Sequence, residues 1–426
     1  MIIDKLFKNI DPVIAEILDR AIEGKEIEIN DAIKLFQSNP NDLSLITAVA
    51  DQLRQQAVGD VVTYVINRNI NFTNVCIKRC GFCAFSRDFR EEEGYILPID
   101  EIVRRSKEAS DLGATEVCIQ AGLPPKMDGN LYIDICTAIK KSLPNIHIHA
   151  FSPEEILYGS ERSGLSIEEY LRSLKDAGLG SLPGTAAEIL DQEIRDTISP
   201  GRISVKNWIK VIKTAHNLKI PTTSTIMYGH VETYNDIAKH IATIRDIQKE
   251  THGFTEFVPL SFVHSEAPMY NNNNTTSKRH VNEGPDGLDV IKIHAISRIM
   301  LNRYIDNIQV SWVKEGPRMS QILLSAGAND LGGTLMNESI STSAGAQFGQ
   351  LMKPRYIRKI IRAANRIPAQ RTSTYKIDRM FLERSEDQDE LLNEVDESIF
   401  GSYNQLIKLD KFRYKIENKL PSKNGL

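Results

Sequence analysis

The sequence lacks both a long hydrophobic run and an excess of basic residues. No stretch approaches the ~18 consecutive apolar residues that a membrane-spanning helix requires, and charged residues interrupt the hydrophobic N-terminus. The formal net charge is -4, whereas proteins that bind nucleic acids or anionic membranes carry basic patches. We therefore expect a cytoplasmic protein that acts on a small molecule, with no nucleic acid and no membrane as partner.

Cysteine is also scarce, with five in a chain of 426 residues. Three of the five fall within eight residues, in the segment NVCIKRCGFC. Such clustering is unsuited to a disulfide framework and is typical of metal ligands in a reducing compartment. The cysteines therefore indicate a metal site.

The predicted secondary structure divides the chain into three parts. Helix-periodic segments fill residues 1–58, with Asp31 and Asp42 as expected caps, and predict a helical N-terminal cap. Residues 59–350 alternate eight β-rich runs with helix-periodic stretches, which favours parallel strands joined by helices. Residues 351–426 are charged and predict a helical C-terminal extension.

The number and spacing of the β-rich runs predict the architecture. The α/β pattern fits a TIM-type (β/α)8 barrel, with an open doubly wound sheet as the alternative. The polar segment 264–287, after the sixth run, predicts either a lid or a disordered insertion, and its Asn run favours disorder. The runs are VVTYVIN, TEVCIQ, IHIHAF, LGSLPG, PTTSTIMYG, TEFVPLSF, NIQVSW and GANDLGG.

The clustered cysteines follow the first predicted barrel strand with CxxxCxxC spacing. Cys76, Cys80 and Cys83 can bind three irons of a cubane, and no fourth cysteine is close in sequence. One iron is then left open, as in catalytic metal sites. A structural zinc site is the alternative and needs a fourth ligand, for which His147 and His149 are the nearest histidines.

This motif, with the aromatic Phe82 before its third cysteine, resembles that of the radical S-adenosylmethionine (SAM) superfamily. The resemblance implies that Cys76, Cys80 and Cys83 bind a 4Fe-4S cluster. It also implies that the open iron is chelated by the amino and carboxylate groups of SAM. Electron transfer from the cluster then cleaves SAM to a 5'-deoxyadenosyl radical, and an electron donor such as ferredoxin or flavodoxin supplies the electron.

Segments spread over most of the chain, among them QAGLPPKMDG and SWVKEGP, carry a closer resemblance, which is to the tyrosine-using FO synthase family of deazaflavin biosynthesis. It implies that a 4-hydroxybenzyl group passes from L-tyrosine to 5-amino-6-(D-ribitylamino)uracil, with release of 2-iminoacetate. Because the chain has a single CxxxCxxC motif, a separate ring-closing FO synthase subunit is expected as partner. The menaquinone-pathway aminofutalosine synthase is the alternative within this class. The segments that carry the resemblance include QAGLPPKMDG, SLPGTAAEIL, STIMYGHVET, SWVKEGP and NDLGGTLMNES.

Several residues near predicted strand ends are candidates for cofactor binding. Gln120 and Gly122 follow the second run, where Gly122 either forms a backbone turn that permits close approach of a ligand or ends the strand in an ordinary turn. Thr185 and Glu188 are expected at the start of a helix, where Glu188 either accepts from ribose hydroxyls or compensates the helix dipole. Arg202 either pairs with a carboxylate of SAM or tyrosine or lies solvated at the surface.

The histidines are the candidates for catalysis. His147 and His149 share one strand face, so they either contact the uracil and move a proton or fill a polar layer of the barrel. His230 lies at the end of the fifth run, with Tyr228 and Glu232 as candidates for cofactor binding, although Glu232 can instead cap the next helix. The division of these groups between SAM and substrate stays open.

Overall fold

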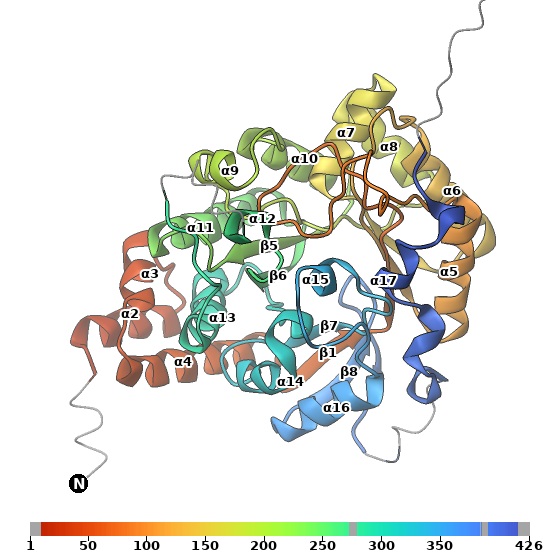
Figure 1. Ribbon diagram of the computed structural model, residues 1–426. Helices are drawn as coiled ribbons and strands as arrows, with labels where there is room; N and C mark the ends of the chain where they lie inside the picture. The colour runs from red at the N-terminus through yellow and green to blue at the C-terminus, as the bar shows by residue number, and fades with distance from the viewer. Residues whose placement is uncertain (1–9, 272–278, 384, 386–390, 416–426) are drawn as a thin grey trace, which may run out of the picture.

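The strands of the protein lie inside a layer of helices (Figure 1). The computed structural model describes residues 10–271, 279–383, 385 and 391–415. None of the helices within these ranges is long and apolar enough to cross a membrane. The strands are β1 (Val61–Val65), β2 (Asn67–Ile70), β3 (Glu116–Ile119), β4 (His147–Ala150), β5 (Thr222–Tyr228), β6 (Phe254–Ser261), β7 (Asp330–Gly333), β8 (Ile367–Arg371) and β9 (Ile377–Met380).

Most strand pairs are parallel, and helices connect them. β2, β3 and β4 pair in chain order, β5 pairs with β6, and β1 pairs with both β7 and β8. The predicted α/β class is therefore confirmed. The connecting helices are α5 (Ile99–Asp111), α6 (Leu131–Ser142), α7 (Pro153–Ser163), α8 (Ile167–Asp176), α9 (Gln192–Ile198), α10 (Val205–Asn217), α11 (Tyr234–Thr251), α13 (Gly287–Leu301) and α14 (Trp312–Leu323).

Two of the eight predicted strands are present only as isolated bridges. Ser181 and Leu182 bridge β4 to β5, through His149 and Thr222. Ile308 and Gln309 likewise bridge β6 to β7. In the first segment the ladder is cut short by Pro183, which has no N–H to donate. The other six predicted runs each contain a named strand.

Three helices occupy the described part of the N-terminal segment, and the second and third begin earlier than the sequence indicates. Both predicted caps are wrong, because Asp31 and Asp42 lie in the first turns of their helices. A proline at the first helical position fixes the start of two of the helices, and Asp11 and Asn39 cap them through their side chains. The helices are α2 (Pro12–Ile22), α3 (Ile29–Phe36) and α4 (Pro40–Val58).

The C-terminal part differs from the predicted helical extension. After α16 (Pro354–Ala363) the chain enters β8, which pairs in parallel with β1 and in antiparallel with β9. Further on, 391–412 contains only short turns: η2 (Leu391–Glu394), η3 (Glu397–Phe400), α17 (Tyr403–Leu406) and η4 (Asp410–Phe412). The prediction of a helical extension is therefore wrong beyond α16, because the pairing of β8 joins residues about 300 positions apart, which no local pattern records.

The segment 264–287 lies partly against the cysteine loop. Its described part contains α12 (Pro268–Asn271), and the Met269 amide donates to the Gly81 carbonyl at 2.7 Å. Most of the Asn run, for which disorder was expected, lies outside the described residues, within 272–278. The choice between lid and disordered insertion therefore stays a prediction.

Candidate active site

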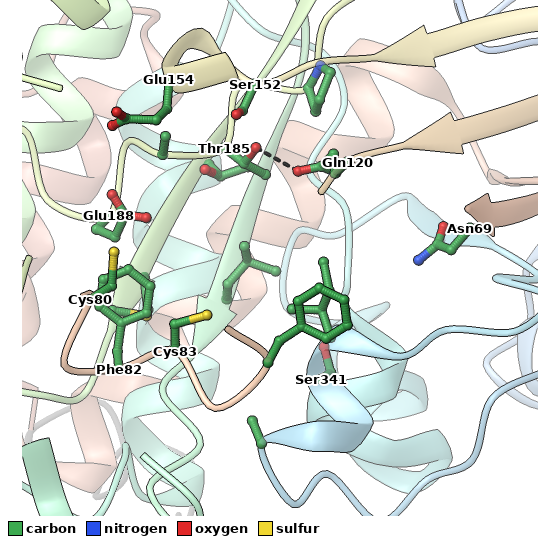
Figure 2. A pocket seen from close by; sticks show the side chains of 18 of the residues that line it. Asn69, Cys80, Phe82, Cys83, Gln120, Ser152, Glu154, Thr185, Glu188 and Ser341 are labelled. Carbon is green, nitrogen blue, oxygen red and sulfur yellow. Dashed lines mark hydrogen bonds between the residues drawn. The ribbon is translucent and has the colours of Figure 1, made fainter. Parts of the chain in front are cut away.

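The loop that carries the three clustered cysteines follows β2 and is held by backbone hydrogen bonds from several elements. The Cys76 amide donates to the Arg87 carbonyl at 3.0 Å, and the Ile77 amide donates to Leu123 at 2.9 Å. All three cysteines line one cavity of about 400 Å³. Figure 2 shows Cys80 and Cys83 at one side of this pocket, beside Phe82. The motif that the sequence singles out therefore borders the pocket.

Burial favours the neutral form of two thiols in this loop. Burial raises the pKa of Cys80 to about 12 and also raises that of Cys76, so a bound metal is needed to keep these groups as thiolates. No group of three or more His, Cys, Asp or Glu side chains converges on a single-ion site within the described ranges. A cubane places each thiolate on a different iron, so its ligands do not have to meet at one point.

Gly122 lets the turn after β3 approach the cysteine loop. Its amide donates to the Thr73 carbonyl at 2.9 Å. A Cβ atom at this position would lie 2.4 Å from the Val75 carbonyl oxygen and 3.1 Å from Cys76 Cβ. Only glycine fits there. The group that comes close to Gly122 is the backbone carbonyl of Val75, not a ligand.

Gln120 and Thr185 lie side by side in the pocket. The Thr185 hydroxyl donates to Gln120 Oε1 at 2.8 Å, as the dashed line in Figure 2 marks. Gln120 Nε2 lies 3.5 Å from Cys118 Sγ. The two side chains, from different strand ends, therefore orient each other, and both line the cavity. Their role toward a cofactor stays a prediction.

Glu188 and Arg202 form an ion pair beside the cysteines. Arg202 Nη1 lies 2.6 Å from Glu188 Oε1, and Arg195 Nη1 lies 3.1 Å from Glu188 Oε2. Both Glu188 and Arg202 line the pocket, so Arg202 is no surface arginine. The expected helix at Thr185 is absent in this described region, because the helix begins only at Gln192, after the cap Asp191. Helix-dipole compensation by Glu188 is therefore excluded.

Two charged pocket residues close to this ion pair were missed in the sequence. Lys78 Nζ lies 3.3 Å from Glu154 Oε1, and Arg202 Nε lies 3.5 Å from Glu154 Oε2. Lys78 stands inside the cysteine motif, and Glu154 opens α7 directly after β4. The rule that active-site groups follow the C-terminal ends of parallel strands is a signal that points to Glu154.

His147 and His149 share one partner. His147 Nε2 and His149 Nδ1 each lie 2.7 Å from the Ser181 hydroxyl. Burial lowers the pKa of His149 to about 4 and also lowers that of His147, so both rings are neutral near pH 7. His149 lines the pocket and His147 is absent from its lining. A catalytic role for either ring stays a prediction.

Tyr228, His230 and Glu232 shape a turn and lie outside the lining of the cysteine pocket. The Glu232 carboxylate accepts hydrogen bonds from the amides of Gly229, His230 and Val231. His230 Nε2 lies 3.0 Å from the Met227 carbonyl oxygen, and the Tyr228 hydroxyl accepts from Ser261 at 3.0 Å. Capping of α11 falls to Thr233 instead of Glu232. The assignment of these three residues to catalysis or cofactor binding stays a prediction.

Further polar residues that line the pocket were missed in the sequence, among them Asn69, Glu256 and Gln309. Each belongs to a strand or bridge segment whose neighbours are mostly buried. When both faces of a strand are buried, the alternation of polar and apolar residues no longer separates the barrel interior from the helix-facing side. The sequence pattern therefore held little information about these positions.

Two protein-family models together match most of the chain. The one described as Radical SAM superfamily matches residues 70–244, and the one described as CofH/MqnC C-terminal region matches residues 251–383. The first match contains all three clustered cysteines. The chain therefore belongs to the radical SAM superfamily, and this membership implies a 4Fe-4S cluster and SAM as cofactors.

Curated relatives narrow the family further. The chain is 50% identical over 356 residues to the 5-amino-6-(D-ribitylamino)uracil–L-tyrosine 4-hydroxyphenyl transferase of Methanocaldococcus jannaschii, with 83% of this chain and 97% of that protein covered. It is also 50% identical over 364 residues to the enzyme of the same name from Methanococcoides burtonii, with 85% and 98% covered. Within the superfamily, the chain belongs to this transferase family.

Solved structures support the fold alone. Methylornithine synthase aligns with a TM-score of 0.64 at 18% identity, over 83% of this chain and 97% of that one. The hydrogenase maturase HydG from Carboxydothermus hydrogenoformans aligns with a TM-score of 0.66 at 16% identity, over 92% and 88%. Together with the superfamily match, these similarities imply a partial TIM barrel.

Proposed function

We propose that this chain joins the 4-hydroxybenzyl group of L-tyrosine to 5-amino-6-(D-ribitylamino)uracil. The observation that carries the proposal is the 50% identity to transferases named for this pair of compounds, over 97% of the length of one relative. We place the reaction in the cavity that the three cysteines line. In this reaction tyrosine loses a hydrogen from its amino group, its Cα–Cβ bond breaks, and the glycine remnant leaves as 2-iminoacetate.

Cys76, Cys80 and Cys83 hold three irons of the cluster in this proposal, and the fourth iron is left to SAM. When bound, the cluster and SAM supply the 5'-deoxyadenosyl radical. The charged groups beside the cysteines, Arg202 and Glu188 among them, suit the carboxylate and ammonium ends of SAM and tyrosine. Backbone hydrogen bonds fix the loop that carries all three cysteines, which supports its proposed role in holding the cluster.

Apolar side chains of the pocket limit the access of water to the reacting groups in this proposal. Apolar side chains line much of the cavity and leave a reactive radical few competing partners. They come from the cysteine loop, from β6 and the residues after it, and from α14, so closure depends on several elements. These side chains are Phe82, Phe85, Val258, Leu260, Phe262 and Val313.

We extend the proposal to the barrel and to the partners. Eight parallel segments form a TIM-type (β/α)8 barrel, a reading supported by the isolated bridges that link β4 to β5 and β6 to β7. A ferredoxin or flavodoxin supplies the electron in the cytoplasm. A separate ring-closing radical SAM enzyme takes the product, a reading supported by the single CxxxCxxC motif of this chain.

An anaerobic turnover assay tests the function. The reconstituted protein is given reductant, SAM and the aminouracil, together with tyrosine labelled with ¹³C at Cβ or at Cα. The Cβ label is expected in the coupled product and the Cα label in 2-iminoacetate, and Cys80→Ala should abolish both. A tyrosine-independent reaction with the substrate of aminofutalosine synthase instead would contradict the proposal.

A further inference from the structure

The strands β2, β3 and β4 arrange polar side chains in two layers. Their register pairs Asn67 with Glu116 and Glu116 with His147, and two residues further on it pairs the next set. Because alternate residues of a strand share a face, the two layers point to the same side of the sheet. The lower layer is Asn67, Glu116 and His147, and the upper layer is Asn69, Cys118 and His149.

The lower layer is filled by the chain itself. Asn67 Nδ2 donates to Glu116 Oε1 at 2.8 Å, and His147 is bonded to Ser181. Beside it, the β8–β9 hairpin inserts two side chains, Arg371 at the end of β8 and Tyr375 in the turn. Arg371 Nε lies 2.6 Å from Asp330 Oδ2, and the Tyr375 hydroxyl donates to Glu256. These internal contacts close this end of the cavity.

The upper layer, in contrast, offers polar atoms without a protein partner. Asn69 Oδ1 is buried and accepts no hydrogen bond from the described residues. Glu256 is 6% exposed, and its Oε2 accepts from Gln309 Nε2 at 2.8 Å and from Tyr375, while no described residue bonds to its Oε1. His149 uses only Nδ1, toward Ser181. We call Asn69, His149, Glu256 and Gln309, all of which line the cavity, the pocket floor.

The two ends of the cavity differ in charge. The cysteine side carries the ion pairs of Arg202 and Lys78 with Glu188 and Glu154, which suit zwitterionic amino-acid groups. The floor carries an amide pair, a neutral imidazole and one carboxylate, Glu256, whose Oε2 lies 3.5 Å from the buried Arg371 Nη2. The four side chains of the floor themselves offer mainly hydrogen-bond acceptors to the cavity. Figure 2 shows Asn69 on the opposite side of the pocket from Cys80 and Glu188.

We propose that the pocket floor binds the uncharged pyrimidine ring of the acceptor, with Asn69 and Gln309 as specificity-determining residues. The inference rests on the proposed function, because it assigns one of its two substrates to one end of the pocket. An aminopyrimidinedione has ring N–H and amino donors that match the free oxygens of Asn69, Gln309 and Glu256, and carbonyl oxygens that match the Asn69 amide. The β8–β9 hairpin acts as a positioning element, since the Tyr375 hydroxyl donates a hydrogen bond to the Glu256 carboxylate.

Equilibrium binding to the unreduced holoenzyme tests the inference without turnover. Asn69→Ala and Gln309→Ala are titrated calorimetrically with the aminouracil and, separately, with tyrosine in the presence of SAM. We expect the Kd for the aminouracil to rise at least about tenfold, which corresponds to the loss of one or two hydrogen bonds. The Kd for tyrosine should stay within about twofold, which also reports that each variant is folded. Gln52→Ala, at an exposed position of α4, is the matched control.

The outcomes separate the inference from the function on which it rests. If both variants bind the aminouracil as tightly as the unmodified enzyme, the floor does not hold the acceptor, although the turnover assay can still succeed. If the Kd for tyrosine rises in place of that for the aminouracil, the floor holds the tyrosine phenol and the inference is overturned. If the unmodified holoenzyme binds no aminouracil at all, the proposed function fails first.

Discussion

Glu155 and Glu169 occupy the same position in two capping boxes, yet their surroundings differ. Each carboxylate accepts from the amide and hydroxyl of the helix cap, Ser152 or Ser166. Glu155 is buried and also accepts from the Ala121 amide in the turn that borders the cysteine pocket. Burial raises the pKa of Glu155 to about 7, whereas the hydrogen bonds of Ser166 lower that of the exposed Glu169.

This difference predicts opposite pH dependences of stability. Between the unfolded value near 4.5 and about 7, the folded protein keeps a proton on Glu155 that the unfolded chain has lost. Stability from this group is therefore full below about pH 4.5 and falls as pH rises through 7, by about 3 kcal/mol at most. Glu155→Gln should flatten the decline between about pH 5.5 and 7 in anaerobic thermal unfolding. Parallel profiles for the variant and the unmodified protein would refute this account of Glu155.

Glu169→Gln is the matched control. Its pKa is lowered in the folded state, so its contribution is present above the unfolded value and is lost only as pH falls toward the folded one. Across about pH 5.5 to 8 its replacement should leave the slope of stability against pH unchanged.

Gly122 gives a second prediction at the scale of one residue. In Gly122→Ala the added Cβ must displace the Val75 carbonyl, which belongs to the backbone next to Cys76. We expect a loss of about 1–3 kcal/mol of stability and a lower iron content after reconstitution. Gly287→Ala, where the new Cβ meets only Met319 Cε at 3.5 Å, should retain full iron. Equal iron content in both variants would contradict the role assigned to Gly122.

How far single residues could be predicted depends on whether their signal is local. The cysteine motif lies within eight residues, so spacing alone found it. Arg202 and Glu188 were found as candidates, but their ion pair required the fold. Asn69 and Gln309 were missed, because the polar residues of their short segments do not show in the sequence which of them face the cavity.

At the scale of elements, the strands of the central region were predictable and the hairpin β8–β9 was not. Most connecting helices show the 3.6-residue period, as in α8 with Ile167, Tyr170, Leu171 and Leu174 buried, and the capping box at the start of α8 is confirmed. The exception is α13, in which every residue from Lys292 to Leu301 is buried. In the sequence the hairpin is a charged segment without a strand pattern. Its position in the fold is defined by the pairing of β8 with β1. Its contact with the pocket floor links the C-terminal part to the site.

The hairpin provides a test at this scale. Arg371→Met leaves Asp330 and the Glu256 carboxylate buried without their cation. Removal of one partner of a buried ion pair typically costs about 3–5 kcal/mol, so the variant should melt well below the unmodified holoenzyme. Lys376→Met, at an exposed position of the same hairpin, is the control and should melt as the unmodified protein does. Equal melting of both variants would contradict the structural role of Arg371.

At the scale of the whole molecule, the cysteine loop is held in place by segments that lie elsewhere in the sequence. The cysteine loop is fixed by Leu123, by Ile198 and by Met269 of the polar segment. The C-terminal part also supports it, because the Tyr403 hydroxyl accepts from Asn74 Nδ2 at 3.1 Å and its ring packs on Phe85. The α/β class followed from the alternation of strands and helices. The contacts that hold the cysteine loop did not follow from it, because they join segments up to 329 residues apart.

The central claim is that three thiolates hold the cluster and leave one iron open to SAM. Electron paramagnetic resonance of the reduced, reconstituted protein, recorded with and without SAM, tests it most directly. We predict that the cluster signal changes on addition of SAM, and that Cys76→Ala, Cys80→Ala and Cys83→Ala each abolish the signal. A cluster whose spectrum is insensitive to saturating SAM would contradict the claim.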